Sequence, residues 1–214
     1  MIAIVAGATG LVGRALVRQL AANKGWREVR ALVRHSLPEA MAAARVTAVP
    51  VDYAHLEPPP SWAAADQVFC ALGTTMREAG SRDAFRRVDY DYVVALARTC
   101  VARGARHFLL VSSLGASSAS RVFYNRVKGE VEEAVADLGF RSVTIARPSL
   151  LLGPRSERRL GEQIGKVLGL VAPARWRPVH AEQVARALVD AATRAEPGVR
   201  ILENRELRSA SHES

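Results

Sequence analysis

The chain has 214 residues, of which 49% are hydrophobic and 24% charged, and its mean hydropathy is +0.03. A single α/β domain of this length can bury a sizeable core, and the composition excludes a polar disordered chain. Uninterrupted apolar stretches fall short of the ~18 residues that a bilayer crossing needs, so we expect no membrane span.

The net charge of +9 is the unusual bulk property, with 30 basic against 21 acidic residues. The basic residues are scattered, and their densest groups are short and lack interleaved aromatic residues. We therefore expect a surface that attracts small anionic ligands, and no nucleic-acid binding. Two cysteines and five histidines without ligand spacing predict neither a disulfide framework nor a metal site. No basic segment precedes the first apolar run, so we expect no secretory leader and a cytoplasmic location.

Apolar runs alternate with segments of helical spacing over most of the chain. The expected strands span residues 2–6, 29–34, 46–51, 66–72, 107–112 and 142–146. The expected helices span residues 11–22, 40–44, 83–103 and 121–137. Because parallel strands need a helical crossover between them, this order predicts an α/β fold, a Rossmann-like doubly wound parallel sheet with helices on both faces.

After Pro148 the alternation loosens. We expect helices over residues 161–170 and 181–192 and a last strand over 199–202. Residues 1–208 are therefore interpreted as one domain, in which 148–208 form a small C-terminal cap on the substrate side, followed by a polar tail, 209–214.

A glycine-rich segment joins the first strand to the first helix. Gly7 permits a tight turn, Gly10 lets backbone amides approach a pyrophosphate, and Gly13 permits close packing of the helix on the strand. The setting between a strand and a helix predicts a dinucleotide site, although a turn built only for packing is the alternative. The predicted cofactor-binding residues here are Gly7, Thr9, Gly10, Leu11, Val12 and Gly13.

The end of the second strand bears on the choice of cofactor. An acidic residue at this point would hydrogen-bond the ribose hydroxyls of NAD, and none is present. Arg34 instead offers a guanidinium that can hold a 2′-phosphate with two hydrogen bonds. The sequence therefore favours NADP over NAD, the alternative being an ordinary surface arginine.

Tyr124 and Lys128 stand four residues apart in the helix expected over 121–137, so they lie on one face of it. A lysine ammonium beside a phenol favours the phenolate and suits the phenol for proton transfer. A serine at the end of the preceding strand, Ser112 or Ser113, could hydrogen-bond a substrate carbonyl oxygen in the crevice where open α/β sheets bind ligands. We interpret this set as an active-site triad.

Together these motifs resemble the short-chain dehydrogenase/reductase family, in its atypical and extended branch, over almost the whole chain. The segments 70–75, 87–93 and 127–132 are similar to the Tat-interacting-protein group of atypical members. Residues 146–153 resemble the Arg-Pro segment that follows strand six in the family.

The resemblance implies a role for each candidate residue. Tyr124 would be the general acid/base, Lys128 would bind the nicotinamide ribose, and Ser113 would orient the carbonyl. Ser112 remains an alternative to Ser113, because adjacent residues of a strand point to opposite faces and only one of the two is expected to serve. The further residues that the resemblance places beside the cofactor are Gly73, Thr74 and Pro148.

The sequence departs from the family pattern at three points. Asp89 stands where extended members often have asparagine, and Leu152 stands where they often have tyrosine. Fewer residues follow Pro148 than in the longer members, which predicts a small or open substrate pocket.

The resulting functional prediction is an enzyme, an NADP(H)-dependent oxidoreductase that acts on a small carbonyl-type substrate. Two alternatives remain open. One is an NADP(H)-binding regulatory or redox-sensing protein without turnover, and the other is an epimerase- or dehydratase-like activity on a nucleotide sugar. The resemblance also implies a homodimer formed through helices 83–103 and 121–137.

Overall fold

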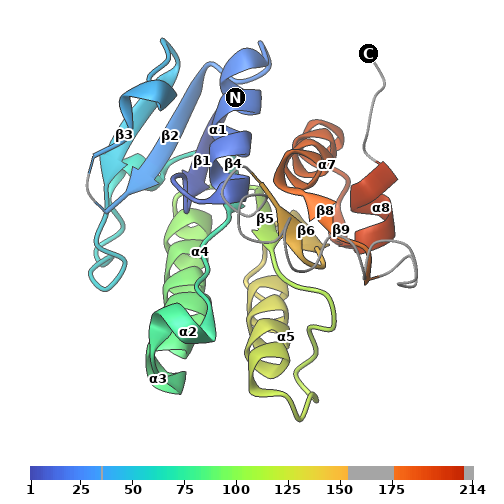
Figure 1. The fold of residues 1–214 in the computed structure, drawn as a ribbon. Coiled ribbons are helices and arrows are strands. Elements are labelled where there is room, and N and C mark those ends of the chain that lie inside the picture. The colour runs from blue at the N-terminus through green and yellow to red at the C-terminus, as the bar shows by residue number, and fades with distance from the viewer. Residues whose placement is uncertain (35, 154–175, 210–214) are drawn as a thin grey trace.

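The structure, a computed structural model, describes residues 1–34, 36–153 and 176–209. Within these ranges seven strands form one parallel sheet in the order β3-β2-β1-β4-β5-β6-β9 (Figure 1). The strands are β1 (Ile2–Ala6), β2 (Glu28–Val33), β3 (Val46–Pro50), β4 (Gln67–Cys70), β5 (His107–Val111), β6 (Ser142–Arg147) and β9 (Gly198–Glu203). The prediction of a Rossmann-like doubly wound sheet is confirmed.

Helices cover both faces of this sheet (Figure 1). On one face lie α1 (Leu11–Ala22), α7 (Ala181–Arg194) and α8 (Asn204–Ser209), and on the other lie α4 (Tyr92–Ala102) and α5 (Phe123–Ala136). Strand β1 shows the cause, because Ala3 and Val5 enter the first core, whereas Ile4 and Ala6 enter the second. A strand with apolar side chains on both sides is stable only between two layers of helices.

The structure corrects several predicted elements. The helix expected over 83–103 is continuous from α3 (Arg82–Arg86) to α4, but a π-helical turn, Arg87–Asp91, separates the two. The alanine-rich segment 40–44 yields only a 3₁₀ turn, Glu39–Met41, after Pro38, and a second such turn is Ser61–Ala63.

The loop expected over 73–82 contains a short helix, α2 (Met76–Ala79), which begins with a capping box of Thr75 and Glu78. The expected tail begins inside α8, which the sequence analysis missed. The expected helix 161–170 and residues 210–214 lie outside the described residues.

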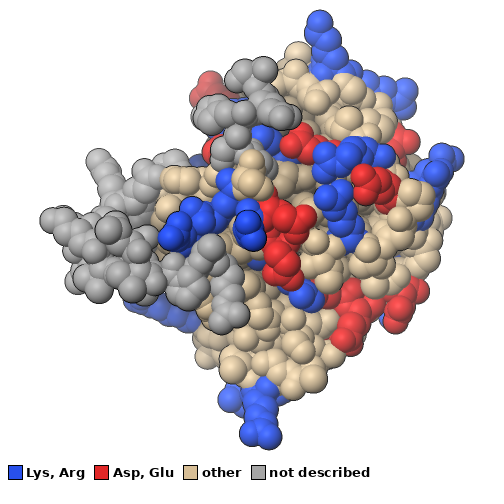
Figure 2. Space-filling model, turned by 90° about the vertical axis from the view of Figure 1, so that its right-hand side faces the viewer, with Lys and Arg blue, Asp and Glu red and all other residues tan. Residues whose placement is uncertain are grey.

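A second, two-stranded sheet pairs β7 (Leu151–Leu152) with β8 (Val179–His180) next to the carboxyl end of β6. Figure 2 views the molecule from the side of α7, α8 and β9, where basic and acidic side chains are interspersed. None of the helices within the described ranges has the length and apolar character of a membrane-spanning segment.

Candidate functional site

The strand order reverses between β1 and β4, which lie side by side although two strands separate them in the chain. From β1 the sheet continues to β2 and β3 on one side, and from β4 it continues to β5 and β6 on the other. In open parallel sheets a crevice forms at this point, outside the carboxyl ends of the strands. The candidate residues all follow strands that end at this edge, or lie on the helices that start there.

The glycine loop is built for close backbone contacts. Gly7 has a φ of +72°, and a Cβ atom there would lie 2.3 Å from the carbonyl oxygen of Ala71, just after β4. A Cβ on Gly13 would lie 2.0 Å from the Gly7 carbonyl oxygen. The Gly10 amide donates a hydrogen bond of 3.0 Å to that same oxygen. At Gly7 and Gly13 the loop therefore approaches neighbouring backbone so closely that no residue with a Cβ atom fits without a shift.

The N-terminus of α1 fits an anionic group. Gly10 caps this helix of 12 residues and has no side chain that could satisfy the amides of the first turn. Thr9 and Gly10 are exposed, Leu11 is half-buried, and Val12 is buried. Because no capping side chain occupies this helix start within the described residues, its amides and the positive end of the helix dipole suit a dinucleotide pyrophosphate.

Arg34 is exposed directly after β2. It lies within electrostatic reach of Tyr53, a buried residue after β3 that the sequence analysis did not select. Burial raises the pKa of Tyr53, the Cys70 thiol adds to this increase, and the Gly7 amide and Arg34 oppose it. The Tyr53 hydroxyl makes no hydrogen bond of normal geometry within the described residues, so it is a free donor beside Gly7 and Arg34. The position of Tyr53 in a short polar segment directly after the third strand could have indicated that it lies near the site.

Lys128 is the buried charge at the centre of the site. Its ammonium lies 2.8 Å from a carboxylate oxygen of Asp89, and the two side chains are 6% and 1% exposed. The other Asp89 oxygen accepts a hydrogen bond of 2.9 Å from the Thr74 amide. A Cβ on Gly73 would lie 3.3 Å from Asp89 and 3.7 Å from the Lys128 nitrogen. The predicted residues Gly73, Thr74 and Lys128 therefore meet around Asp89.

Opposing effects set the protonation of Lys128. Burial lowers the pKa of this lysine, but the negative charge of Asp89 and the proximity of Tyr124 and Cys70 outweigh burial and raise it above its ordinary value. Lys128 is therefore a fixed positive charge at neutral pH. Asp89, noted in the sequence only as a departure from asparagine, is the residue that keeps it charged.

Tyr124 lies in the first turn of α5, one turn before Lys128, and is half-buried. Its ring packs against Phe85 of α3 with 5.3 Å between the ring centroids. The loop before α5 crosses the helix at Gly129, where a Cβ would lie 2.1 Å from the backbone of Ser117 and Ser118. This crossing fixes the loop that leads from Ser113 to Tyr124.

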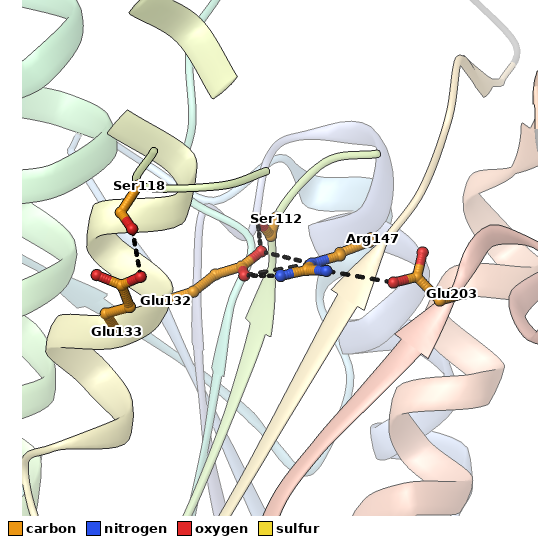
Figure 3. Close-up of polar contacts among 6 residues, drawn as sticks. All are labelled: Ser112, Ser118, Glu132, Glu133, Arg147 and Glu203. Atoms are coloured by element: carbon orange, nitrogen blue, oxygen red, sulfur yellow. Dashed lines mark hydrogen bonds and ion pairs between the residues drawn. The ribbon is translucent and has the colours of Figure 1, made fainter. Parts of the chain in front are cut away.

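The two candidate serines differ in their surroundings. Ser112 donates its hydroxyl hydrogen bond to Glu132 of α5, so its hydroxyl is already engaged (Figure 3). Ser113 is 9% exposed, and its hydroxyl oxygen has no hydrogen-bond partner within the described residues. A buried hydroxyl without a partner is uncommon in proteins. Ser113 is therefore the serine with a free hydroxyl for a ligand.

Pro148 is buried directly after β6. Its carbonyl oxygen accepts a hydrogen bond of 2.8 Å from the Leu114 amide, which places it beside the end of β5. Asn204, which is 1% exposed in α8, accepts 2.9 Å from the Ser149 amide and donates 2.9 Å to the Arg177 carbonyl oxygen. The segment after β6 is thereby joined to the C-terminal helix. No motif or spacing in the sequence indicates a role for Asn204, which stands between the charged residues Glu203 and Arg205.

Comparisons with known proteins show the family to which the chain belongs. A family model described as NAD(P)H-binding matches residues 7–195. The protein FMP52 of Eremothecium gossypii is 35% identical over 98% of this chain and 96% of its own length. The protein HTATIP2 of Rattus norvegicus is 37% identical over 84% of this chain and 75% of its own length.

Among solved structures, MoeE5 in complex with UDP-glucose and NAD is similar in fold, with a TM-score of 0.73. The match covers 94% of this chain and 74% of MoeE5 at 19% sequence identity. This likeness confirms the fold.

The comparisons correct one expectation. The FMP52 relatives of three fungi carry the word mitochondrial in their names. The names of these relatives therefore contradict the predicted cytoplasmic location. That prediction rested on the absence of a basic segment before the first apolar run, which is a criterion for secretory leaders alone.

The fold, the glycine loop and the relatives together show that the chain belongs to the NAD(P)H-binding family, in the atypical and extended branch of the short-chain dehydrogenases/reductases that contains HTATIP2 and FMP52.

Proposed function

We propose that this protein is an NADPH-dependent reductase of small carbonyl compounds. The observation that carries the proposal is the buried Lys128 ammonium, held by Asp89 against Gly73 and next to Tyr124. A structural ion pair would not need a glycine beside it and a phenol one helical turn away. A cationic group in this position suits proton transfer by the phenol and contact with a ribose.

The residues divide the work of such a reaction. Bound NADPH would supply the hydride to the carbonyl carbon. Tyr124 would donate its phenolic proton to the carbonyl oxygen, and the Lys128 charge would stabilise the phenolate that remains. Ser113, with its free hydroxyl, would hydrogen-bond the same oxygen and orient it toward Tyr124.

The preference for NADPH rests on the neighbourhood of Arg34. Arg34 is exposed after β2, and the Tyr53 hydroxyl is influenced both by the charge of Arg34 and by the backbone amide of Gly7 in the glycine loop. A 2′-phosphate at this point would receive charge-assisted hydrogen bonds from Arg34 and a neutral one from Tyr53.

The test is a binding titration with NADPH, NADP, NADH and NAD, followed by turnover on a panel of aldehydes, ketones and quinones. Arg34→Ala should weaken NADPH binding about 10- to 100-fold, as the loss of a charged hydrogen-bond donor predicts, and should change NADH binding little. Arg141→Ala is the matched control, because Arg141 is exposed just before β6, at the opposite edge of the sheet.

Tyr124→Phe should bind NADPH normally and lose turnover by roughly 100-fold or more, since it lacks the proton donor. Tyr90→Phe, on the π-helical turn, should retain turnover. If the parent binds NADPH and reduces no carbonyl, the reductase proposal fails, and the regulatory alternative then requires a partner whose binding depends on the nucleotide. An epimerase would instead convert a nucleotide sugar with no net change in NADPH.

A further inference from the structure

Helix α5 presents three polar side chains to the sheet in successive turns. Tyr124, Lys128 and Glu132 are spaced four residues apart, and residues at this spacing share one helix face. Lys128 and Glu132 are each 5% exposed. The first two belong to the proposed active site, whereas Glu132 has no role in it so far.

The Glu132 carboxylate contacts residues at the ends of two strands, β5 and β6, and is linked to the end of a third, β9, through Arg147 (Figure 3). Arg147, the last residue of β6, contacts it through Nε at 3.1 and 3.2 Å and through Nη2 at 2.5 Å. The same guanidinium reaches Glu203, the last residue of β9, at 3.3 Å through Nη1. Ser112, directly after β5, donates its hydroxyl hydrogen bond to Glu132.

Both residues that contact Glu132 directly precede a predicted site residue in the chain. Ser112 precedes Ser113, and Arg147 precedes Pro148. The bond that holds Ser112 to Glu132 constrains the backbone immediately before Ser113, whose buried hydroxyl has no hydrogen-bond partner within the described residues. The Glu132 carboxylate therefore relates the orientation of Ser113 to the position of Tyr124 along α5.

A contribution to the stability of the fold does not by itself explain the ion pair between Glu132 and Arg147. Buried ion pairs are expensive to desolvate, and apolar residues of similar volume often replace them without loss of stability. The pair is also separate from the one that neutralises Lys128, which uses Asp89 from a different element. Helix α5 is thus fixed at two successive turns, once to the helix of Asp89 and once to the strand ends.

We propose that Glu132 and Arg147 are positioning residues, which hold α5 and the end of β5 in the register that brings Ser113 and Tyr124 to one carbonyl oxygen. The proposal rests on the reductase function proposed above. It predicts an effect on the chemical step, because a misplaced proton donor slows catalysis while cofactor binding continues.

The experiment compares Glu132→Gln with Glu133→Gln. Glu133 is the next residue of the same helix and bonds to Ser118 in the exposed loop, so its substitution removes the same charge without touching a strand end (Figure 3). Glu132→Gln should lower kcat roughly tenfold or more, with KM and the NADPH Kd within about twofold of the parent. Glu133→Gln should leave kcat unchanged.

A second variant separates positioning from folding. The triple replacement Ser112→Ala, Glu132→Leu and Arg147→Met removes the three polar side chains around the buried carboxylate and leaves only Glu203, which is exposed, so that no buried polar group of the network is left unpaired. The proposal requires this variant to regain the melting temperature of the parent but not its kcat. Recovery of both together, or a normal kcat in Glu132→Gln, would overturn it.

A readout without turnover keeps the two proposals distinct. In the purified protein labelled with [¹³Cζ]tyrosine, the Tyr124 resonance is assigned with Tyr124→Phe and titrated with pH. A midpoint moved by Glu132→Gln and not by Glu133→Gln supports the positioning role even if the parent reduces no carbonyl, in which case only the reductase proposal fails. A midpoint that neither variant moves contradicts the positioning role.

Discussion

At the scale of single residues, Asp89 determines what Lys128 can do. A lysine that is buried beside apolar residues tends to lose its proton, because a low-dielectric surrounding disfavours the charged form. Asp89 reverses this at Lys128 and uses its second oxygen to hold the Thr74 amide. One carboxylate thus fixes both the charge of the proposed active site and the loop that is expected to lie along the cofactor.

A second buried titratable residue, His107, lies away from the site at the start of β5. It is 2% exposed, its Nε2 lies 2.9 Å from the Thr144 hydroxyl, and its Nδ1 has no partner within the described residues. Burial lowers the pKa of His107 to about 4. The folded protein therefore keeps this histidine neutral over a range in which the unfolded chain protonates it.

This difference predicts a loss of stability in acid. Between the unfolded pKa of about 6.5 and the folded pKa, the unfolded state binds the additional proton, so the free energy of unfolding falls as the pH falls, by about 3 kcal/mol at pH 4. Urea denaturation at a series of pH values measures this slope. His107→Gln should flatten it relative to the parent, and the exposed control His55→Gln should not. Parallel slopes for His107→Gln and the parent would contradict this assignment.

At the scale of elements, the helix from Arg82 to Ala102 shows how a local irregularity builds a site. The Tyr92 amide bonds to the Arg87 carbonyl oxygen, five residues back, so one turn holds an additional residue. The wide turn contains Asp89, whose carboxylate faces Lys128 of the neighbouring helix. Such turns are frequent at functional sites, and the hydrophobic spacing of the segment predicts only a regular helix.

Helix α5 allows a test of the loop crossing that precedes Tyr124. In an ordinary helix Gly129→Ala would stabilise the protein by about 1 kcal/mol. Here the new methyl group would meet the backbone of Ser117 and Ser118 at 2.1 Å, so we expect a net destabilisation of roughly 2 kcal/mol. Thermal and urea denaturation measure it.

The control is Gly25→Ala, whose Cβ would meet the ends of two side chains among the described residues, Asn23 at 3.1 Å and Met1 at 3.9 Å, and no backbone. It should change stability by less than about 0.5 kcal/mol. A Gly129→Ala variant as stable as the parent would show that the loop can leave α5 without cost.

At the scale of the whole molecule, the parallel sheet gathers one functional group from each of several distant segments at one edge. The glycine loop follows β1, Arg34 follows β2, Gly73 follows β4, and Ser113 follows β5. The net charge of +9 adds a general attraction for anions, on which the specific contact of Arg34 would be superimposed.

Salt separates these two electrostatic contributions. Raising NaCl from about 0.05 to 0.5 M should weaken NADPH binding several-fold and NADH binding less, because the 2′-phosphate contact at the exposed Arg34 is screened. The preference for NADPH over NADH should therefore decrease with salt in the parent and be small at every salt concentration in Arg34→Ala. A preference independent of salt would exclude recognition of the phosphate through charge.

The layered fold and a first set of candidate site residues could be predicted from the sequence. Continuous apolar runs mark strands that are buried on both faces, the glycine loop stands where a strand meets a helix, and the four-residue spacing of Tyr124 and Lys128 places them on one helix face. These are local properties, because each depends on residues close together in the chain.

Which distant residues meet could be learned from the three-dimensional structure alone. The pairing of Asp89 with Lys128, the engagement of Ser112 by Glu132, and the contact of Arg147 with Glu203 each join segments that are far apart in the sequence. Strand order and register bring them together, and no periodicity within a single segment encodes that choice. For the same reason the sequence could propose two serines, while the packing of α5 against the strand ends distinguishes the engaged one from the free one.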